Sequence, residues 1–403
     1  MTAPAVRDGA TPIHAAEPGR AAAPVPMLRG HMPALDGVRG LAILAVLLFH
    51  FYGAMAPDNG AERAVVRVLS EGAHGVDLFF VLSGFLITGI LHDSLRKPHF
   101  FRNFYARRFL RIFPLYYAVL FAVFFLAPLV PAFRGPALEY LRERQAWAWL
   151  YGVNVYIGLK GQWALGYLDH FWSLSVEEHF YFVWPFVVWL LGRDARRLMW
   201  ISLGVAVAAT VAHVAGNVAG LSWWTTMVLT PFRLDGLALG GFLALLARQP
   251  GGTETIVRKL PVAAAFAGAL LVLSYVWVVA GWPGLAIVYP LRLTVILVLL
   301  AALLIRALTA PVGSPTGRFF RSRPMIFLGT YSYGLYVYHH FFSYYMLTHR
   351  TEFLVQRWVG SHLAAVLLQS TCGILASIGV AYLSYELFEK RILSLKRWFE
   401  PSR

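Results

Sequence analysis

The sequence of 403 residues contains a single cysteine, Cys372, and only 14% charged residues. One cysteine excludes an intrachain disulfide, and its place in an apolar run predicts a packing role. The redox compartment therefore stays open. Glycine-rich phosphate loops, CxxC pairs and HExxH are also absent, which excludes the usual signatures of nucleotide hydrolysis and of zinc proteases.

Apolar residues, by contrast, make up 58% of the chain, and the mean hydropathy is +0.60. This is more apolar sequence than a soluble core can bury, so the chain is predicted to cross the membrane several times. Residues 1–30 are rich in Ala, Pro and Gly and lack the apolar core of a signal peptide, which predicts a disordered cytoplasmic tail. Residues 31–390 are expected to form the membrane domain, and residues 391–403 a short basic cytoplasmic tail.

Runs of about twenty apolar residues predict an all-α bundle of about ten membrane-spanning helices. The predicted spans are 35–55, 74–93, 108–131, 171–191, 198–218, 224–247, 261–281, 285–305, 325–347 and 361–387. The segment 132–170 lies between two of them and is predicted to be interfacial or re-entrant, because its apolar stretch is too short to cross with confidence.

The basic residues set the predicted orientation. Most of the 35 Lys and Arg fall in segments that this arrangement places on one side. The positive-inside rule then puts both termini in the cytoplasm. The net charge of +15 is thus mainly an orientation signal that also favours anionic lipid headgroups, and no nucleic-acid partner is expected.

The first span contains an arginine and a histidine separated by ten residues, Arg39 and His50. Eleven steps of about 100° return a helix to nearly the same face, roughly 16 Å further along. An imidazole at that depth in a bilayer is costly, so a functional role is favoured over a satisfied structural histidine.

Five further residues in the predicted outer half of the membrane are candidates for a site. Asp77 lies near the outer end of its span, as a helix cap or as part of the site. Glu177 and Glu178 lie about two turns into theirs, where one carboxylate could orient an imidazole. His339 and His340 lie among tyrosines in the outer half, and two histidines are hard to explain as interface residues alone.

The inner half carries an arginine cluster, Arg107, Arg108 and Arg111, at the start of the third predicted span. Such a cluster anchors topology, and it could also bind a phosphorylated cytosolic donor, because guanidinium groups bind phosphate bidentately. Arg233 and Asp235 lie in mid-span, as a buried ion pair that fixes helix register or as substrate contacts.

The predicted depths of these residues in the membrane suggest that an anionic donor binds at the cytoplasmic side. A group would then be transferred towards the outer side. A polar route through a helix bundle is equally typical of transporters. The residues alone therefore leave two alternatives open, group transfer and translocation of a glycolipid or polysaccharide precursor.

Five ordered motifs give the chain a family resemblance: LDGVRGLAILAVLLFHF, GVDLFFVLSGFLITG, FYARRFLRIFPLYY, WSLSVEEHFYFVWP and GTYSYGLYVYH. Together they extend over about Leu35 to Glu389, and their combination resembles the membrane acyltransferase family 3. The resemblance implies a multi-pass enzyme of the bacterial inner membrane. It would move an acyl group, usually acetyl, from cytoplasmic acyl-CoA to a hydroxyl of a carbohydrate or glycolipid, and it leaves the oligomeric state open.

The family's arginine and histidine signature falls on Arg39 and His50. The resemblance implies His50 as the general base or a transient acyl carrier, and Arg39 as a residue that stabilises donor or oxyanion charge. The RxxR motif falls on Arg108 and Arg111, which would hold the coenzyme A phosphates. No metal is expected, because thioester chemistry needs none.

A further motif, WSLSVEEQFY, falls on Trp172 to Tyr181. It implies that Glu177 or Glu178 tunes His50, while His179 stands where glutamine is usual. Many relatives carry a C-terminal hydrolase-like domain outside the membrane. The chain ends soon after its tenth predicted span, so no second acyl-transfer site of that kind is expected.

Overall fold

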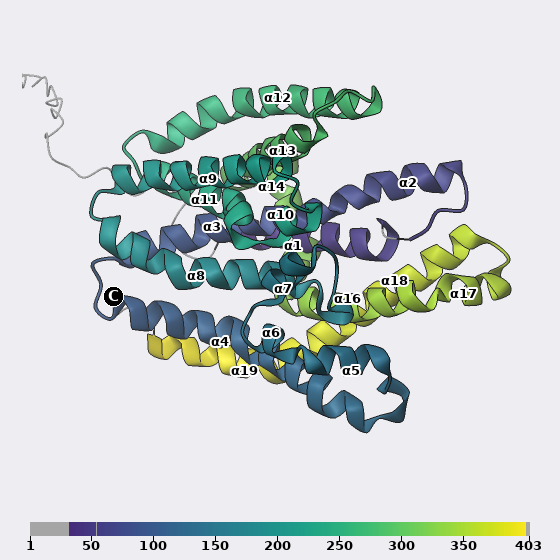
Figure 1. The fold of residues 1–403 in the computed structure, drawn as a ribbon. Coiled ribbons are helices and arrows are strands. Elements are labelled where there is room, and N and C mark those ends of the chain that lie inside the picture. Colours follow the sequence, from purple (N-terminus) through teal and green to yellow (C-terminus); the bar gives the residue numbers. More distant parts are fainter. Residues whose placement is uncertain (1–31, 54, 400–403) are drawn as a thin grey trace, which may run out of the picture.

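The computed structural model describes residues 32–53 and 55–399, which are almost entirely helical and contain no β-strand (Figure 1). The predicted tail over residues 1–30 lies outside these residues. The long helices are α1 (Pro33–Leu48), α3 (Gly75–Ser94), α4 (Phe100–Phe121), α8 (Phe171–Leu191), α9 (Ala195–Val218), α11 (Thr230–Leu246), α12 (Gly252–Val279), α13 (Leu285–Thr309), α16 (Ser332–His349) and α18 (His362–Ser384).

Shorter helices connect them. They are α2 (Gly60–Ser70), α5 (Pro136–Glu143), α6 (Gln145–Trp149), α7 (Val153–Lys160), α10 (Trp223–Val228), α14 (Pro315–Phe320), α15 (Arg323–Thr330), α17 (Thr351–Val359) and α19 (Lys390–Leu393). The segment 132–170 thus folds into three short helices, each far below the length of about 20 residues that a bilayer requires. This confirms that the segment contains no spanning helix.

Eight helical segments are long and apolar enough to cross a membrane, which confirms a polytopic helix bundle. Helices α8 and α16 coincide with two more of the predicted spans but are not among the eight. Their 21 and 18 residues include acidic, histidine and tyrosine residues that lower the hydropathy. The count of about ten spans and the cytoplasmic placement of both termini stay predictions. Cys372 is exposed on α18, so its predicted packing role is wrong.

Helix α1 lies inside the bundle and contacts α3, α13, α15 and α16, whereas α12 lies at the edge and packs mainly on α13 (Figure 1). Small residues bring α3 and α11 together. A Cβ added to Gly84 would lie 1.8 Å from the carbonyl oxygen of Leu237, and one added to Gly240 would lie 2.0 Å from that of Val81. Such close backbone contact is typical of membrane helices with small residues at their interface.

Replacing Gly84 with valine is therefore expected to destabilise the protein by more than about 3 kcal/mol, because backbone rather than a flexible side chain must move. The matched control is Gly268→Val on α12, where nothing lies within 4 Å of an added Cβ. Thermal unfolding of both variants in detergent measures the difference. Equal melting temperatures would contradict the close packing of α3 on α11.

Candidate active site

His50 lies just beyond the regular part of α1. The last residues of this span, Phe49–Gly53, form a π-helical turn, a local widening that occurs often at functional sites. The turn leaves His50 partly buried, with Nδ1 3.0 Å from the carbonyl oxygen of Val46. Beside it the rings of His339 and His340 on α16 approach to 4.7 and 5.2 Å between centroids.

The hydrogen bonds of this cluster fix the position of its protons. His339 Nδ1 lies 2.8 Å from the carbonyl oxygen of Tyr336 and 3.1 Å from that of Leu335, so Nδ1 carries the hydrogen and Nε2 of the neutral ring has a lone pair. His339 Nε2 lies 3.3 Å from His50 Nδ1. Because His50 Nδ1 thus faces two acceptors, this lone pair and the Val46 oxygen, it must donate. Nε2 of a neutral His50 is then unprotonated.

Three histidines this close could also hold a metal ion, since one nitrogen from each of His50, His339 and His340 lies within 4.8 Å of the others. Each ring donates through one nitrogen to a carbonyl oxygen outside the cluster: His50 to Val46, His339 to Tyr336, and His340 to Gly166 at 3.3 Å. The second nitrogen of each neutral ring is then unprotonated. That no metal takes part stays a prediction.

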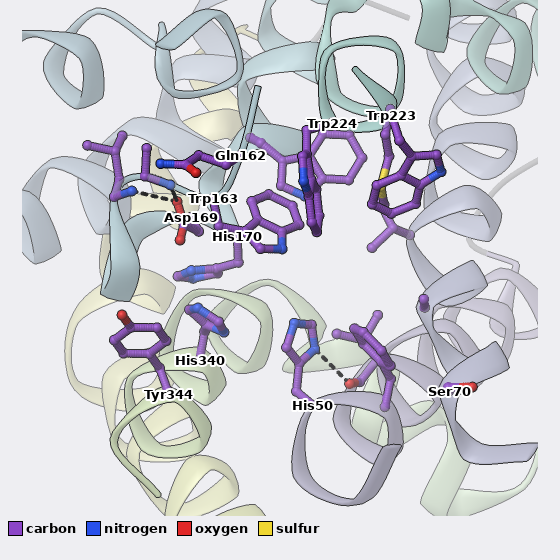
Figure 2. Close-up of a pocket in the computed structure, with 18 of the residues that line it drawn as sticks. His50, Ser70, Gln162, Trp163, Asp169, His170, Trp223, Trp224, His340 and Tyr344 are labelled. Carbon is purple, nitrogen blue, oxygen red and sulfur yellow. Dashed lines mark hydrogen bonds between the residues drawn. The ribbon is translucent and has the colours of Figure 1, made fainter. Parts of the chain in front are cut away.

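A cavity of about 1010 Å³ adjoins His50. It is bordered by residues of α3, α8, α10, α13 and α16. Figure 2 shows the imidazole of His50 projecting into it, with Trp163 and Trp224 across the open space and His170 and His340 at one side. His170 Nε2 donates to the carbonyl oxygen of Val337 at 3.1 Å, which ties the start of α8 to α16.

Asp77 and Arg233 also line this cavity. Asp77 is 4% exposed and forms a salt bridge with Arg233 on α11, and His74 Nδ1 donates to its second oxygen at 2.6 Å. Arg233 thus forms a buried ion pair, one of the two expected alternatives, and its partner in the salt bridge is Asp77 on α3. Side chains two positions apart on a helix point about 200° apart, so Asp235 faces away and accepts from the backbone of Gly236 instead.

Arg39 lies apart from the cavity, at the other end of the same helix. Its Nη1 is 2.6 Å from the carboxylate of Asp36. It is close enough to Arg108 and Arg111 on α4 for their charges to interact. The structure thus brings the arginine of the first span together with the RxxR pair, although Arg39 and Arg108 are 69 positions apart in the sequence.

The C-terminal residues extend this cationic cluster. The turn Ser394–Phe399 packs against α4. There the charge of Lys396 interacts with those of Arg107, Arg108 and Arg111, while Glu389 interacts with Arg111. Like charges gathered in one place repel one another, so the cluster is suited to a ligand with several negative charges.

Glu177 and Glu178 line neither this cavity nor the smaller pocket beside Arg39. Ser83 Oγ donates to Glu177 at 2.6 Å, and Tyr181 also binds Glu177. Both carboxylates interact electrostatically with Arg108. One oxygen of Glu178 is buried and has no hydrogen-bond partner within residues 32–53 and 55–399.

The sequence of the helical region matches a known protein family. A family model described as an acyltransferase domain matches residues 32–386. This chain belongs to that acyltransferase family. The match covers every residue of the histidine cluster and of the cavity, together with the arginines of α1 and α4.

Bacterial members of the acyltransferase family are similar to this chain over 77% of its length. They include the peptidoglycan O-acetyltransferase OatA of Listeria monocytogenes (27% identical), the putative peptidoglycan O-acetyltransferase YrhL of Bacillus subtilis (31%) and the O-acetyltransferase OatA of Staphylococcus aureus (27%). The matched parts cover 49%, 48% and 50% of these proteins. The chain thus spans about half the length of the curated relatives it matches. No solved structure gives a significant match.

The side chain that hydrogen-bonds to His50 is His339 of α16, and its backbone partner is the Val46 oxygen. No hydrogen bond joins Glu177 or Glu178 to His50 among the described residues, although a carboxylate was expected to tune it. His179, at the position where the family motif usually has glutamine, has Nδ1 2.7 Å from the hydroxyl oxygen of Thr230. A glutamine amide could make the same contact, so the departure leaves this polar link between α8 and α11 in place.

Proposed function

We propose that this chain is a membrane O-acyltransferase of the bacterial inner membrane. It moves an acyl group, preferably acetyl, from cytoplasmic acyl-CoA to a hydroxyl group of a carbohydrate. The observation that carries the proposal is the unprotonated Nε2 of His50 at a large cavity, roughly 16 Å along α1 from a cationic cluster. The names of the bacterial relatives support the reaction class.

In this proposal, the binding site of the acyl donor is inferred from the positive charges of the arginine cluster. Arg39, Arg108 and Arg111 bind the phosphates of acyl-CoA, because guanidinium groups form paired, charge-assisted hydrogen bonds with phosphate oxygens. Coenzyme A carries its thioester at the end of a long, uncharged arm. That arm extends past Glu177 towards His50, so the phosphates stay at the cluster while the thioester reaches the cavity.

The chemical step uses the lone pair of His50. Nε2 removes the proton from the acceptor hydroxyl, and the oxygen attacks the thioester carbonyl carbon. A carbon–oxygen bond forms, the carbon–sulfur bond breaks, and the leaving thiolate takes the proton from the imidazolium. His339 accepts the hydrogen bond of His50 Nδ1 throughout, which fixes the ring and stabilises its protonated form.

The test is acyl transfer across a membrane. The purified protein is reconstituted into liposomes, with acetyl-CoA carrying a labelled acetyl group on the side of the arginine cluster and a soluble peptidoglycan fragment on the other. We expect the fragment to gain one acetyl ester, detected by mass spectrometry and removed by mild base. Appearance of unmodified fragment across the bilayer, without ester, would instead identify a transporter and contradict the proposal.

His339 gives a second prediction. His339→Phe removes the side-chain acceptor of His50 Nδ1 and leaves only the Val46 oxygen. We expect kcat to fall roughly 10- to 100-fold with KM for both substrates nearly unchanged. His339→Gln offers a carbonyl oxygen in place of the lone pair and is expected to retain more activity than His339→Phe. Nitrogen-15 NMR of labelled His50 reads the proton position directly. Equal kcat in the two variants and an unchanged His50 spectrum would show that His339 only packs.

A further inference from the structure

Four of the 13 tryptophans line the cavity beside His50: Trp163, Trp172, Trp223 and Trp224. Trp163 and Trp224 lie 4.8 Å apart between ring centroids and are tilted by 57°, so they do not stack face to face. Trp163 remains 39% exposed. Interfacial tryptophans usually project away from the protein, and Trp358 is 91% exposed. Trp163 and Trp224 instead line the same cavity as the candidate base (Figure 2).

The loop that carries Trp163 is held in place on its C-terminal side. The Asp169 carboxylate accepts hydrogen bonds from the backbone N–H groups of Ala164 at 3.1 Å and Leu165 at 2.7 Å. Burial raises the pKa of Asp169 to about 6, so the group is still a carboxylate at neutral pH. The next residue, Gly166, accepts the hydrogen bond of His340. Trp163 is therefore held in a set position relative to the histidine cluster.

Both arginines of the cavity are paired with carboxylates. Arg233 forms a salt bridge with Asp77, and Arg292 lies 3.6 Å from the carboxylate of Glu71. Such a lining does not offer a surplus of positive charge to a phosphate-bearing ligand. It offers aromatic faces with polar groups around them, which suits the apolar face and the hydroxyl rim of a pyranose ring.

We propose that Trp163 and Trp224 form the acceptor subsite, on which a pyranose ring of an oligosaccharide stacks with one hydroxyl directed at His50. The cavity of about 1010 Å³ is at the upper end of the range of roughly 300–1,000 Å³ seen for small-molecule sites, so it has room for more than one sugar ring. This subsite deepens the proposed function and rests on it for the identity of the transferred group.

The test measures acceptor recognition apart from chemistry. Trp163→Ala and Trp224→Ala are expected to raise KM for a soluble peptidoglycan disaccharide about 3- to 10-fold and to leave kcat within about twofold. Trp163→Phe should restore most of the loss, because it returns an aromatic face. A disaccharide fragment is expected to bind more tightly than the corresponding monosaccharide, since it fills more of the cavity.

Trp358→Ala on α17 is the matched control and should behave as the wild type. Binding is measured a second time by calorimetry in a His50→Gln background without donor, so that no turnover occurs. Saccharide binding that is lost with Trp163 but retained without His50 supports the subsite even if no acetyl transfer is found, and then only the proposed function fails. Equal KM and equal binding in Trp163→Ala, Trp224→Ala and Trp358→Ala would overturn the subsite.

Discussion

His50→Gln is expected to lower kcat for acetyl transfer by roughly 10²- to 10⁴-fold, the usual contribution of a general base. Glutamine can keep the hydrogen bond to the Val46 oxygen through its amide, but it offers no basic lone pair to the cavity. KM for the donor should change little, because the arginine cluster lies at the far end of α1. The measurement is the initial rate in reconstituted liposomes with equal amounts of inserted protein.

His349→Gln is the control for this variant. His349 lies at the exposed end of α16, where its ring stacks on Tyr345 at 4.1 Å between centroids, away from the cavity lining. It should retain wild-type kcat and thermal stability. A His50→Gln protein that acetylates at the wild-type rate would remove His50 from the chemical step.

Arg111→Ala is expected to raise KM for acetyl-CoA roughly 10- to 100-fold, because one charge-assisted contact to phosphate is lost. The acceptor KM should stay constant, since Arg111 is remote from the cavity. Dephospho-coenzyme A thioesters, which carry less charge, should lose less affinity in the variant than acetyl-CoA does. Initial rates at varied acetyl-CoA, dephospho-thioester and acceptor concentrations measure the three quantities.

The control here is Arg102→Ala, which removes the same side chain from the exposed first turn of α4 and leaves the cluster intact. Its donor KM should match the wild type at equal ionic strength. If both variants raise KM equally, the effect is a general surface potential, and the assignment of Arg111 to the donor phosphates is contradicted.

His50 could be picked out as a candidate site residue from the sequence, because a histidine in an apolar run gains nothing from packing in a bilayer. The arginine cluster was predictable from its spacing on one helix. That Arg39 joins this cluster was not, since nothing in the sequence fixes how α1 and α4 lie against each other. The pairing of Arg233 with Asp77 escaped prediction for the same reason, because the residues are 156 positions apart.

Other site residues could not be recognised from the sequence pattern. His170 precedes α8 in a polar turn and was not singled out, yet its ring lies 4.6 Å from that of His340. Ser83 looks like any small residue in an apolar helix, and it binds Glu177. Trp163 resembles an interfacial tryptophan in the sequence. Each became a candidate only through its neighbours, which come from distant helices.

Hydrophobic run length determined the class of this protein from the sequence alone, because a bilayer requires about 20 apolar residues per helix and tolerates ionisable groups only at a cost. Tertiary structure alone decided which polar side chains meet. The approach of α16 to the π-helical end of α1 supplies His339 as the partner of His50, and the loop before α8 places Trp163 across from it. Helix periodicity sets the direction of a side chain, but only packing between helices sets what it touches.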